Sequence, residues 1–186
     1  MIMIKKVVLA VLILGLAGGG FFYWWNSQSD VRELNKTLPD GVRVVKGLIG
    51  KEYKVINKID GYEFKVPAEW RGVKEIEYMP ERTEDKYTGT SVNLEGKEGS
   101  ATIFAIDQFR VENVILKIWA EKFFNIFELV GDFSEDIVGE FEVVKTQESI
   151  HLGGMWVYFF KKGSSIYSIT NGSEDFIRYI ITNGKW

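Results

Sequence analysis

The stretch Met155–Thr170, MWVYFFKKGSSIYSIT, carries the clearest information about the fold. Its first part, Met155–Lys161, is almost wholly apolar, which is typical of a central strand covered on both faces. Lys162-Gly163-Ser164 has the composition of a hairpin turn, and Ser165–Thr170 predicts the partner strand. Because a strand buried on both faces needs a layer on each side, this stretch favours a domain of three layers.

Further strands are predicted from a partial alternation of apolar and polar residues. They cover Gly41–Lys46, Glu52–Ile59, Tyr62–Val66, Val73–Met79, Ser91–Leu94, Ala101–Ile106 and Gly139–Gln147. Short turns such as Asp60-Gly61 join neighbouring strands, which favours an antiparallel sheet. Pro67 should end the strand before it, because proline cannot donate a hydrogen bond to the ladder.

Two helices are predicted to cover this sheet. Val111–Phe127 has a helical spacing of apolar residues, with Leu116 and Phe124 beside the main stripe, so a wide buried side is expected. The stripe consists of Val111, Val114, Ile115, Ile118, Trp119, Phe123, Ile126 and Phe127. Ser173 can cap a second helix, Glu174–Thr182. The predicted fold class is therefore α+β, with a mainly antiparallel central sheet flanked by helices in an α/β/α sandwich.

The N-terminal segment has the pattern of a membrane anchor. An uncharged run, Val7–Trp25, follows Lys5 and Lys6 and ends in five aromatic residues. At about 1.5 Å per residue it would be about 28 Å long, close to the thickness of the hydrocarbon core. We therefore predict a single transmembrane helix at 7–25 that contacts the lipid bilayer. Two alternatives are a signal peptide cleaved after Ala17, and a buried helix, which Gly18–Gly20 would weaken.

This interpretation divides the chain into four parts. Residues 1–6 would be cytoplasmic, 7–25 would span the cell membrane, 26–40 would be a linker and 41–186 would form an extracytoplasmic domain. Without the two lysines before the span, 21 basic and 26 acidic residues remain, a net charge of −5. That charge argues against nucleic acid as a partner.

The composition excludes several kinds of chemistry. The chain has no Cys, so it can form neither disulfides nor thiolate metal sites, and His151 is its one histidine. His151 follows Ser149 by two positions, but no nucleophile-elbow or oxyanion-hole glycine motif accompanies them. We predict no catalytic residues, no cofactor-binding residues and no cofactor.

The densest group of acidic residues lies between positions 75 and 85. Oxygen-rich clusters can hold calcium, so the group contains weak candidates for metal ligands. These candidates are Glu77, Glu81, Glu84 and Asp85. Lys74, Arg82 and Lys86 interleave with the acids, which favours a solvated strand edge and loop instead.

The segment Gly61–Trp70, GYEFKVPAEW, resembles the opening strand of PsbP-like domains, whose pattern is GYxFxxPxxW. The order of the elements that follow is similar too, and the resemblance covers about Lys46–Asn183. It implies an α/β/α sandwich shared with Ran-binding Mog-type proteins, here as a membrane-anchored prokaryotic member. The best-known members are extrinsic subunits of photosystem II that help to retain calcium and chloride. Because most members are non-enzymatic, the resemblance supplies no catalytic residues.

These observations predict a membrane-anchored, extracytoplasmic binding or accessory module that docks a protein partner of the membrane or envelope. The predicted anchor, the order of strands and helices, and the shortage of catalytic groups all favour it. An alternative is a small extracytoplasmic hydrolase or ligand-processing enzyme that uses carboxylates. That alternative requires a deep pocket holding two acids with perturbed pKa values.

Overall fold

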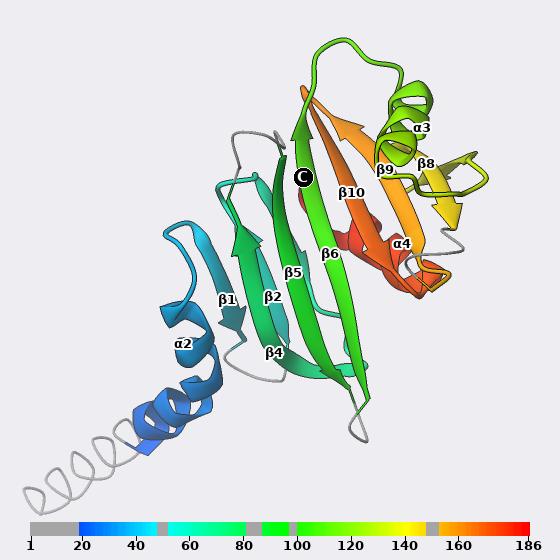
Figure 1. Cartoon of the computed structure of the whole chain (residues 1–186). Helices are drawn as coiled ribbons and strands as arrows, with labels where there is room; N and C mark the ends of the chain where they lie inside the picture. Colours follow the sequence, from blue (N-terminus) through cyan, green and yellow to red (C-terminus); the bar gives the residue numbers. More distant parts are fainter. Residues whose placement is uncertain (1–18, 48–51, 81–86, 97–99, 148–152) are drawn as a thin grey trace, which may run out of the picture.

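Figure 1 shows a computed structural model of the chain, which describes residues 19–47, 52–80, 87–96, 100–147 and 153–186. Most of these residues form two antiparallel β-sheets. The smaller sheet has the order β1-β2-β3, and the larger has the order β4-β5-β6-β10-β9-β8-β7. The strands are β1 (Val42–Lys46), β2 (Tyr53–Asn57), β3 (Tyr62–Lys65), β4 (Trp70–Met79), β5 (Tyr87–Gly96), β6 (Ala101–Arg110), β7 (Ser134–Val138), β8 (Phe141–Gln147), β9 (Trp156–Lys162) and β10 (Ser165–Asn171).

Three short helices accompany the sheets, and residues 19–27 are helical as well. The helices are α2 (Ser29–Lys36), α3 (Leu116–Ile126) and α4 (Glu174–Asn183). The predicted cap of the last helix is confirmed, because the Ser173 hydroxyl accepts a hydrogen bond from Phe176 N at 3.3 Å. In Figure 1, α3 lies on one face of the larger sheet and α4 on the other.

The predicted α/β/α sandwich has to be corrected, because the fold is mostly antiparallel β. Pro67 does end the third strand, as predicted, and Trp70 N donates a turn hydrogen bond to the Pro67 carbonyl at 3.1 Å. The chain then starts a new sheet at β4, so none of β1, β2 and β3 is a strand of the larger sheet. This small sheet and α4 together cover one face of the larger sheet, where we expected a layer of helices.

The prediction that the apolar strand is covered on both faces is confirmed. Four successive residues of β9, Val157 to Phe160, are buried. Tyr158 and Phe160 belong to the core between the two sheets and α4, whereas Val157 and Phe159 belong to the core beneath α3. We call the first the inner core and the second the outer core. Alternate residues of one strand thus connect two separate cores.

The predicted buried stripe of the α3 helix is partly wrong. The helix begins at Leu116 rather than Val111, and its fully buried residues are Ala120 and Phe124. Leu116, Trp119 and Phe123 pack against the outer core. Four members of the predicted stripe are instead exposed to solvent, namely Ile115, Ile118, Ile126 and Phe127. The apolar stripe of the helix is wide, and Ile118 lies on the side that also carries Lys122 and Asn125, so the hydrophobic pattern alone did not determine which apolar residues face the sheet.

Residues 26–40, expected to be a linker, contain α2, which is docked on the small sheet. Val31 is buried in the inner core. The Asn35 amide donates to the Val44 carbonyl at 2.8 Å and accepts from Val44 N at 2.7 Å. These two bonds attach the helix to the backbone of β1. Tyr53 OH also donates to Asp30 at 2.6 Å. Figure 1 shows α2 beside β1.

The predicted transmembrane helix at 7–25, and with it the single-pass location in the cell membrane, has to be corrected. Among the residues that the structure describes, no helix is both long and apolar enough to cross a membrane. The described part of the predicted span starts at Gly19, and charged residues of α2 begin at Asp30. Residues 7–18 of that prediction lie outside the described residues.

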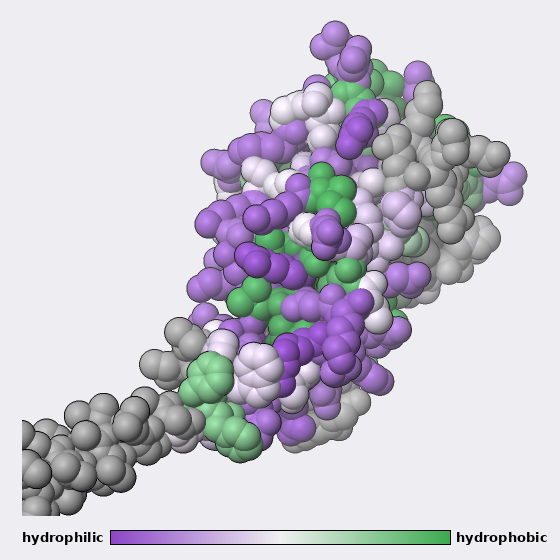
Figure 2. Space-filling model, turned by 90° about the vertical axis from the view of Figure 1, so that its left-hand side faces the viewer, coloured by the Kyte–Doolittle hydropathy of each residue, from purple (hydrophilic) through white to green (hydrophobic). Residues whose placement is uncertain are grey.

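Figure 2 shows the face of the molecule on the α2 side, where polar side chains surround smaller apolar areas. Hydrophobic side chains lie at the surface next to the grey segment. Phe21, Phe22, Tyr23 and Trp25 are the exposed aromatic residues at this end of the described chain. Arg32 lies 4.1 Å above the centre of the Trp25 ring, a cation–π contact that links residues 19–27 to α2.

A buried carboxylate joins the two sheets. Asp60, in the turn between β2 and β3, is 2% exposed, and its carboxylate accepts hydrogen bonds from Asn57 Nδ2 and Thr88 Oγ1, both at 2.7 Å. Its backbone carbonyl accepts from Tyr167 OH at 2.7 Å and from Gln108 Nε2 at 3.0 Å. Tyr78 OH of β4 also donates to Asp60 Oδ1, at 3.4 Å. The turn of the small sheet is therefore hydrogen-bonded to four strands of the large one, β4, β5, β6 and β10.

We predict that Asp60→Ala lowers the free energy of unfolding by about 2–4 kcal/mol, because it leaves buried donors of Asn57 and Thr88 without an acceptor. Urea unfolding followed by tryptophan fluorescence measures the change. Asp40→Ala, at an exposed turn, is the matched control and should change stability by less than about 0.5 kcal/mol. Equal effects of the two substitutions would contradict a structural role for the buried carboxylate.

Candidate functional site

The four candidate metal ligands are not brought together within the described part of the chain. Glu77 lies on β4 and is exposed, whereas Glu81, Glu84 and Asp85 lie outside the described residues. No group of three or more His, Asp or Glu side chains that could hold a metal ion occurs among the described residues. Ser149 and His151 also lie outside the described residues.

The main candidate site is instead the outward side of α3 and its surroundings, which we call the α3 face. Ile115 is 68% exposed and Ile126 is 75% exposed, and Ile118 lies between them on the same side of the helix. Other large apolar side chains near the helix are exposed as well, namely Phe127, Val130 and Ile137. An apolar surface of this kind is a feature of interaction sites.

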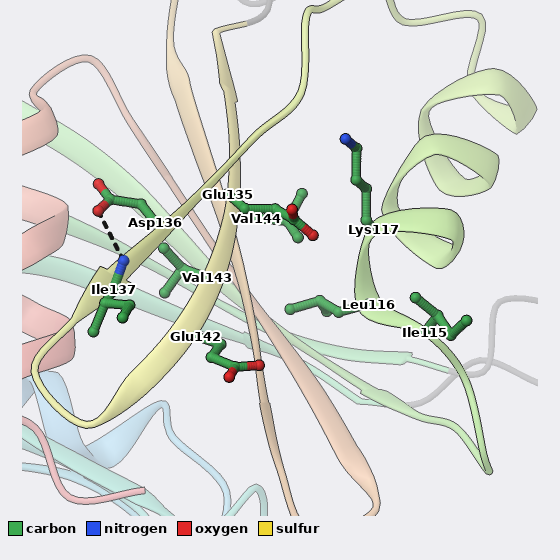
Figure 3. A pocket seen from close by; sticks show the side chains of 9 residues that line it. All are labelled: Ile115, Leu116, Lys117, Glu135, Asp136, Ile137, Glu142, Val143 and Val144. Atoms are coloured by element: carbon green, nitrogen blue, oxygen red, sulfur yellow. Dashed lines mark hydrogen bonds between the residues drawn. The ribbon is translucent and has the colours of Figure 1, made fainter.

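A groove lies between the N-terminal end of α3 and the hairpin β7–β8, with a volume of about 470 Å³. In Figure 3, Leu116 and Lys117 come from the helix side, and Glu135, Glu142 and Val144 come from the strands opposite. Ile115, Asp136, Ile137 and Val143 complete the lining. We call it the N-terminal groove. Its lining combines apolar residues with three acidic residues and one lysine.

An ion network fixes the strand that forms one wall of this groove. Arg178 Nη1 donates to Asp136 Oδ2 at 2.7 Å, and Lys145 Nζ lies 3.1 Å from the same oxygen. The Arg178 guanidinium is the main reason why the pKa of Asp136 falls to about 2. Asp136 Oδ1 also accepts from Ile137 N at 2.7 Å, the bond drawn in Figure 3. This bond occupies a backbone donor on the edge strand β7, which makes pairing with another strand there less favourable.

A second groove, of about 550 Å³, lies between the C-terminal end of α3 and the outer face of the large sheet. We call it the C-terminal groove. Its lining is mostly apolar and aromatic, and none of its described residues is Lys, Arg or His. It consists of Tyr87, Ala105, Asp107, Phe109, Phe123, Phe124, Phe127, Glu128, Leu129, Val157, Ser168 and Thr170.

Asp107 lies on the floor of this second groove between small residues of the neighbouring strands. In the sheet register it is paired with Gly89 of β5 on one side and with Ser168 of β10 on the other. A Cβ at Gly89 would come within 2.6 Å of Asp107 Oδ1. The carboxylate therefore occupies the space that the side chain of any other residue at position 89 would fill. Ser168 Oγ donates to Asp107 Oδ2 at 3.2 Å.

The environment of this carboxyl changes its acidity. Burial raises the pKa of Asp107 from its ordinary value of 3.8 to about 6, while the hydrogen bond from Ser168 acts in the opposite direction. At neutral pH the carboxyl is therefore mostly ionised, and no basic residue of the described groove lining compensates its charge. A charge of this kind in an apolar groove favours a cationic partner.

Stacked aromatic rings form the helix wall of the C-terminal groove. Phe123 is stacked on Trp119 with ring centres 5.3 Å apart, and it meets Phe109 of β6 edge to face at 5.0 Å. Phe159 of β9 supports Phe123 from below at 5.9 Å. Each ring contacts at least one other, so this wall of the groove is well packed.

The comparisons with known proteins leave the identity of the chain open: no family model, no curated protein and no solved structure matches it. The likeness to PsbP-like domains stays a prediction.

Asp107 was not among the residues that we expected to be functional, because the predicted strand ended at Ile106. The strand in fact runs to Arg110, so Asp107 occupies an outward position in line with Ile103, Ala105 and Phe109. The signal in the sequence was an acidic residue in line with apolar residues on one face of the strand. It was missed because the predicted strand ended one residue before Asp107.

We predict that Asp107→Asn stabilises the protein at pH 7.5 more than at pH 4.5. A carboxyl with a raised folded-state pKa stabilises the fold below the unfolded pKa, and that contribution is lost as the pH rises toward about 6. The difference between 3.8 and about 6 corresponds to at most about 3 kcal/mol. Urea unfolding at both pH values measures it, with exposed Asp132→Asn as the control. If the difference in unfolding free energy between Asp107→Asn and the unmodified protein is the same at both pH values, the raised pKa of Asp107 is contradicted.

Proposed function

We propose that the protein is a binding or accessory module without enzymatic activity, and that its α3 face docks a protein partner. The docked segment presents apolar side chains that alternate with basic ones. The observation that carries this proposal is the orientation of α3, whose exposed side bears Ile115, Ile118 and Ile126.

A helix that only completes a core usually exposes polar residues on its solvent side. In α3, Leu116, Ala120 and Phe124 face the sheet, and the isoleucines of the outward side have no apolar neighbour layer in the described chain. Burial of one such side chain is worth about 1.5–3 kcal/mol, so several of them can anchor a partner. The sequence thus carries apolar residues that folding of this chain does not use.

The charges around the α3 face indicate what the partner carries. Glu135 and Glu142 border the N-terminal groove, and Asp107 and Glu128 line the C-terminal groove. Lys117 is the one basic residue in the described lining of either groove. Acidic sites beside apolar surface complement a partner that combines apolar and basic side chains.

The alternative, a hydrolase that uses two carboxylates, finds less support in this geometry. Asp107 is on the floor of the C-terminal groove, whereas Glu128 is exposed in the turn that follows α3. A catalytic pair needs both groups directed at one reacting atom within a sheltered pocket. An apolar groove with a single sheltered acid is better suited to binding.

We predict that a photo-crosslinking amino acid at position 126, in cells that produce the protein, joins it to a distinct protein. The same amino acid at position 45, an exposed valine of β1, should give no such product. Ile118→Asp should reduce the product at position 126 by about tenfold, because it places a charge in the apolar contact. Mass spectrometry identifies the species.

Two results would contradict this proposal. One is the same set of products from positions 45 and 126, which would mean that the crosslinks arise from random encounter. The other is a product of twice the chain mass of 21.3 kDa, which would assign the α3 face to a second copy of this chain.

A further inference from the structure

We propose that the C-terminal groove receives a lysine side chain of the partner, with the ammonium group at Asp107 and the methylene stem along Phe123 and Phe127. This inference rests on the proposed function and specifies the chemistry of one part of the docked segment.

The position of the acid in the groove supports a cationic occupant. Asp107 is set between Gly89 and Ser168, so neither neighbouring side chain covers it. Among the described residues, the lining of the groove supplies no basic group that could neutralise it. A ligand that brings its own positive charge would compensate a carboxylate that has no ion-pair partner among the described residues.

The hydrogen bonding of the acid favours an ammonium over a guanidinium. Ser168 Oγ already donates to Asp107 Oδ2, so a fork of two parallel hydrogen bonds from an arginine would compete with the serine for that oxygen. An ammonium needs one oxygen, and Oδ1 lies over Gly89, next to the methyl group of Met79. The unbranched stem of a lysine can also lie on apolar surface while its charged end reaches a polar group.

The aromatic wall contributes in the same direction. Phe109, Phe123 and Phe127 line the groove around the acid, and a cation near an aromatic face gains additional attraction. An anionic ligand would meet Asp107 and Glu128 as like charges. An uncharged apolar ligand would fill the groove but leave the carboxylate uncompensated.

The test uses hexylammonium as the probe, with hexanol as its uncharged counterpart, on the full chain at pH 7.5. Binding is measured by titration and is followed at Phe123 and Phe127 by NMR. We expect hexylammonium to bind about tenfold or more tightly than hexanol. Asp107→Asn should remove that preference and keep the binding of hexanol, whereas Asp132→Asn should change neither. Equal binding of the two probes by the unmodified protein would overturn the proposal.

The pH dependence gives a second readout that needs no variant. An ammonium that binds the ionised carboxyl lowers its pKa, so the affinity for hexylammonium should rise as the pH increases through about 6 and then level off. The other titratable groups at the site are Glu128 and Tyr87 in the lining, and Asp60 on the opposite face of the sheet. Asp107→Asn should abolish the rise near pH 6, and a rise that persists in that variant would overturn the proposal.

A final arm distinguishes the source of the ammonium. The peptides acetyl-Leu-Lys-Leu-amide and acetyl-Leu-Gln-Leu-amide are compared on the unmodified protein and on Asp107→Asn. Preference for the lysine peptide, lost in the variant, supports the proposal. Binding of hexylammonium without binding of either peptide would assign the groove to a free amine and overturn the lysine source. Failure of the crosslinking experiment with intact probe binding would instead overturn the protein partner and leave the groove chemistry standing.

Discussion

The hydrogen bonds of Asp60 hold the two sheets in one arrangement, and the rest of the molecule follows from that arrangement. The turn that carries this residue belongs to the small sheet, while Thr88 and Tyr167 belong to the large one. A buried carboxylate is costly unless its hydrogen bonds are made, so few other placements of the small sheet would keep it satisfied. Once the small sheet is fixed there, it shares the inner face of the large sheet with α4, and α3 is left with the outer face.

This division of the two faces explains why the outer side is less completely covered. The inner face of the large sheet is covered by the small sheet, α2 and α4. The inner core includes the buried side chains of Phe64 from β3 and Phe104 from β6. The outer core has a single helix of eleven residues above five strands of the large sheet. One helix is too narrow for such an area. The grooves at its two ends are the places where sheet residues are reached by the solvent.

Much of the fold could be predicted from the sequence, because strands and turns are specified locally. Alternation located every strand of the small sheet, Pro67 marked its end, and the hairpin around Lys162-Gly163-Ser164 was recognised from composition. The partition into two sheets was not predictable in the same way. A proline shows where a strand stops, but which sheet the next strand joins depends on long-range packing.

The candidate site was hidden from the sequence for a related reason. Periodicity shows that a helix has an apolar stripe, but in α3 this stripe is wide, and the position of the sheet decides which of its residues are buried. Asp107 was hidden because its strand continues four residues beyond the predicted end at Ile106. Both features become visible only when α3 is placed on the face of the sheet to which Asp107 of β6 points.

The two features that were missed in the sequence have one physical property in common: each makes the folded state of the isolated chain less stable. Isoleucines on the outward side of α3 lose the stabilisation that burial would give, and an ionised Asp107 in an apolar groove raises the energy of the folded state at neutral pH. A chain folding for stability alone would place polar residues at positions 115, 118 and 126 and an apolar residue at position 107. The two costs lie around the same helix: the isoleucines are spread along its outward side, and Asp107 lies in the groove at its C-terminal end. One ligand that is apolar along its length and cationic at its tip would relieve both.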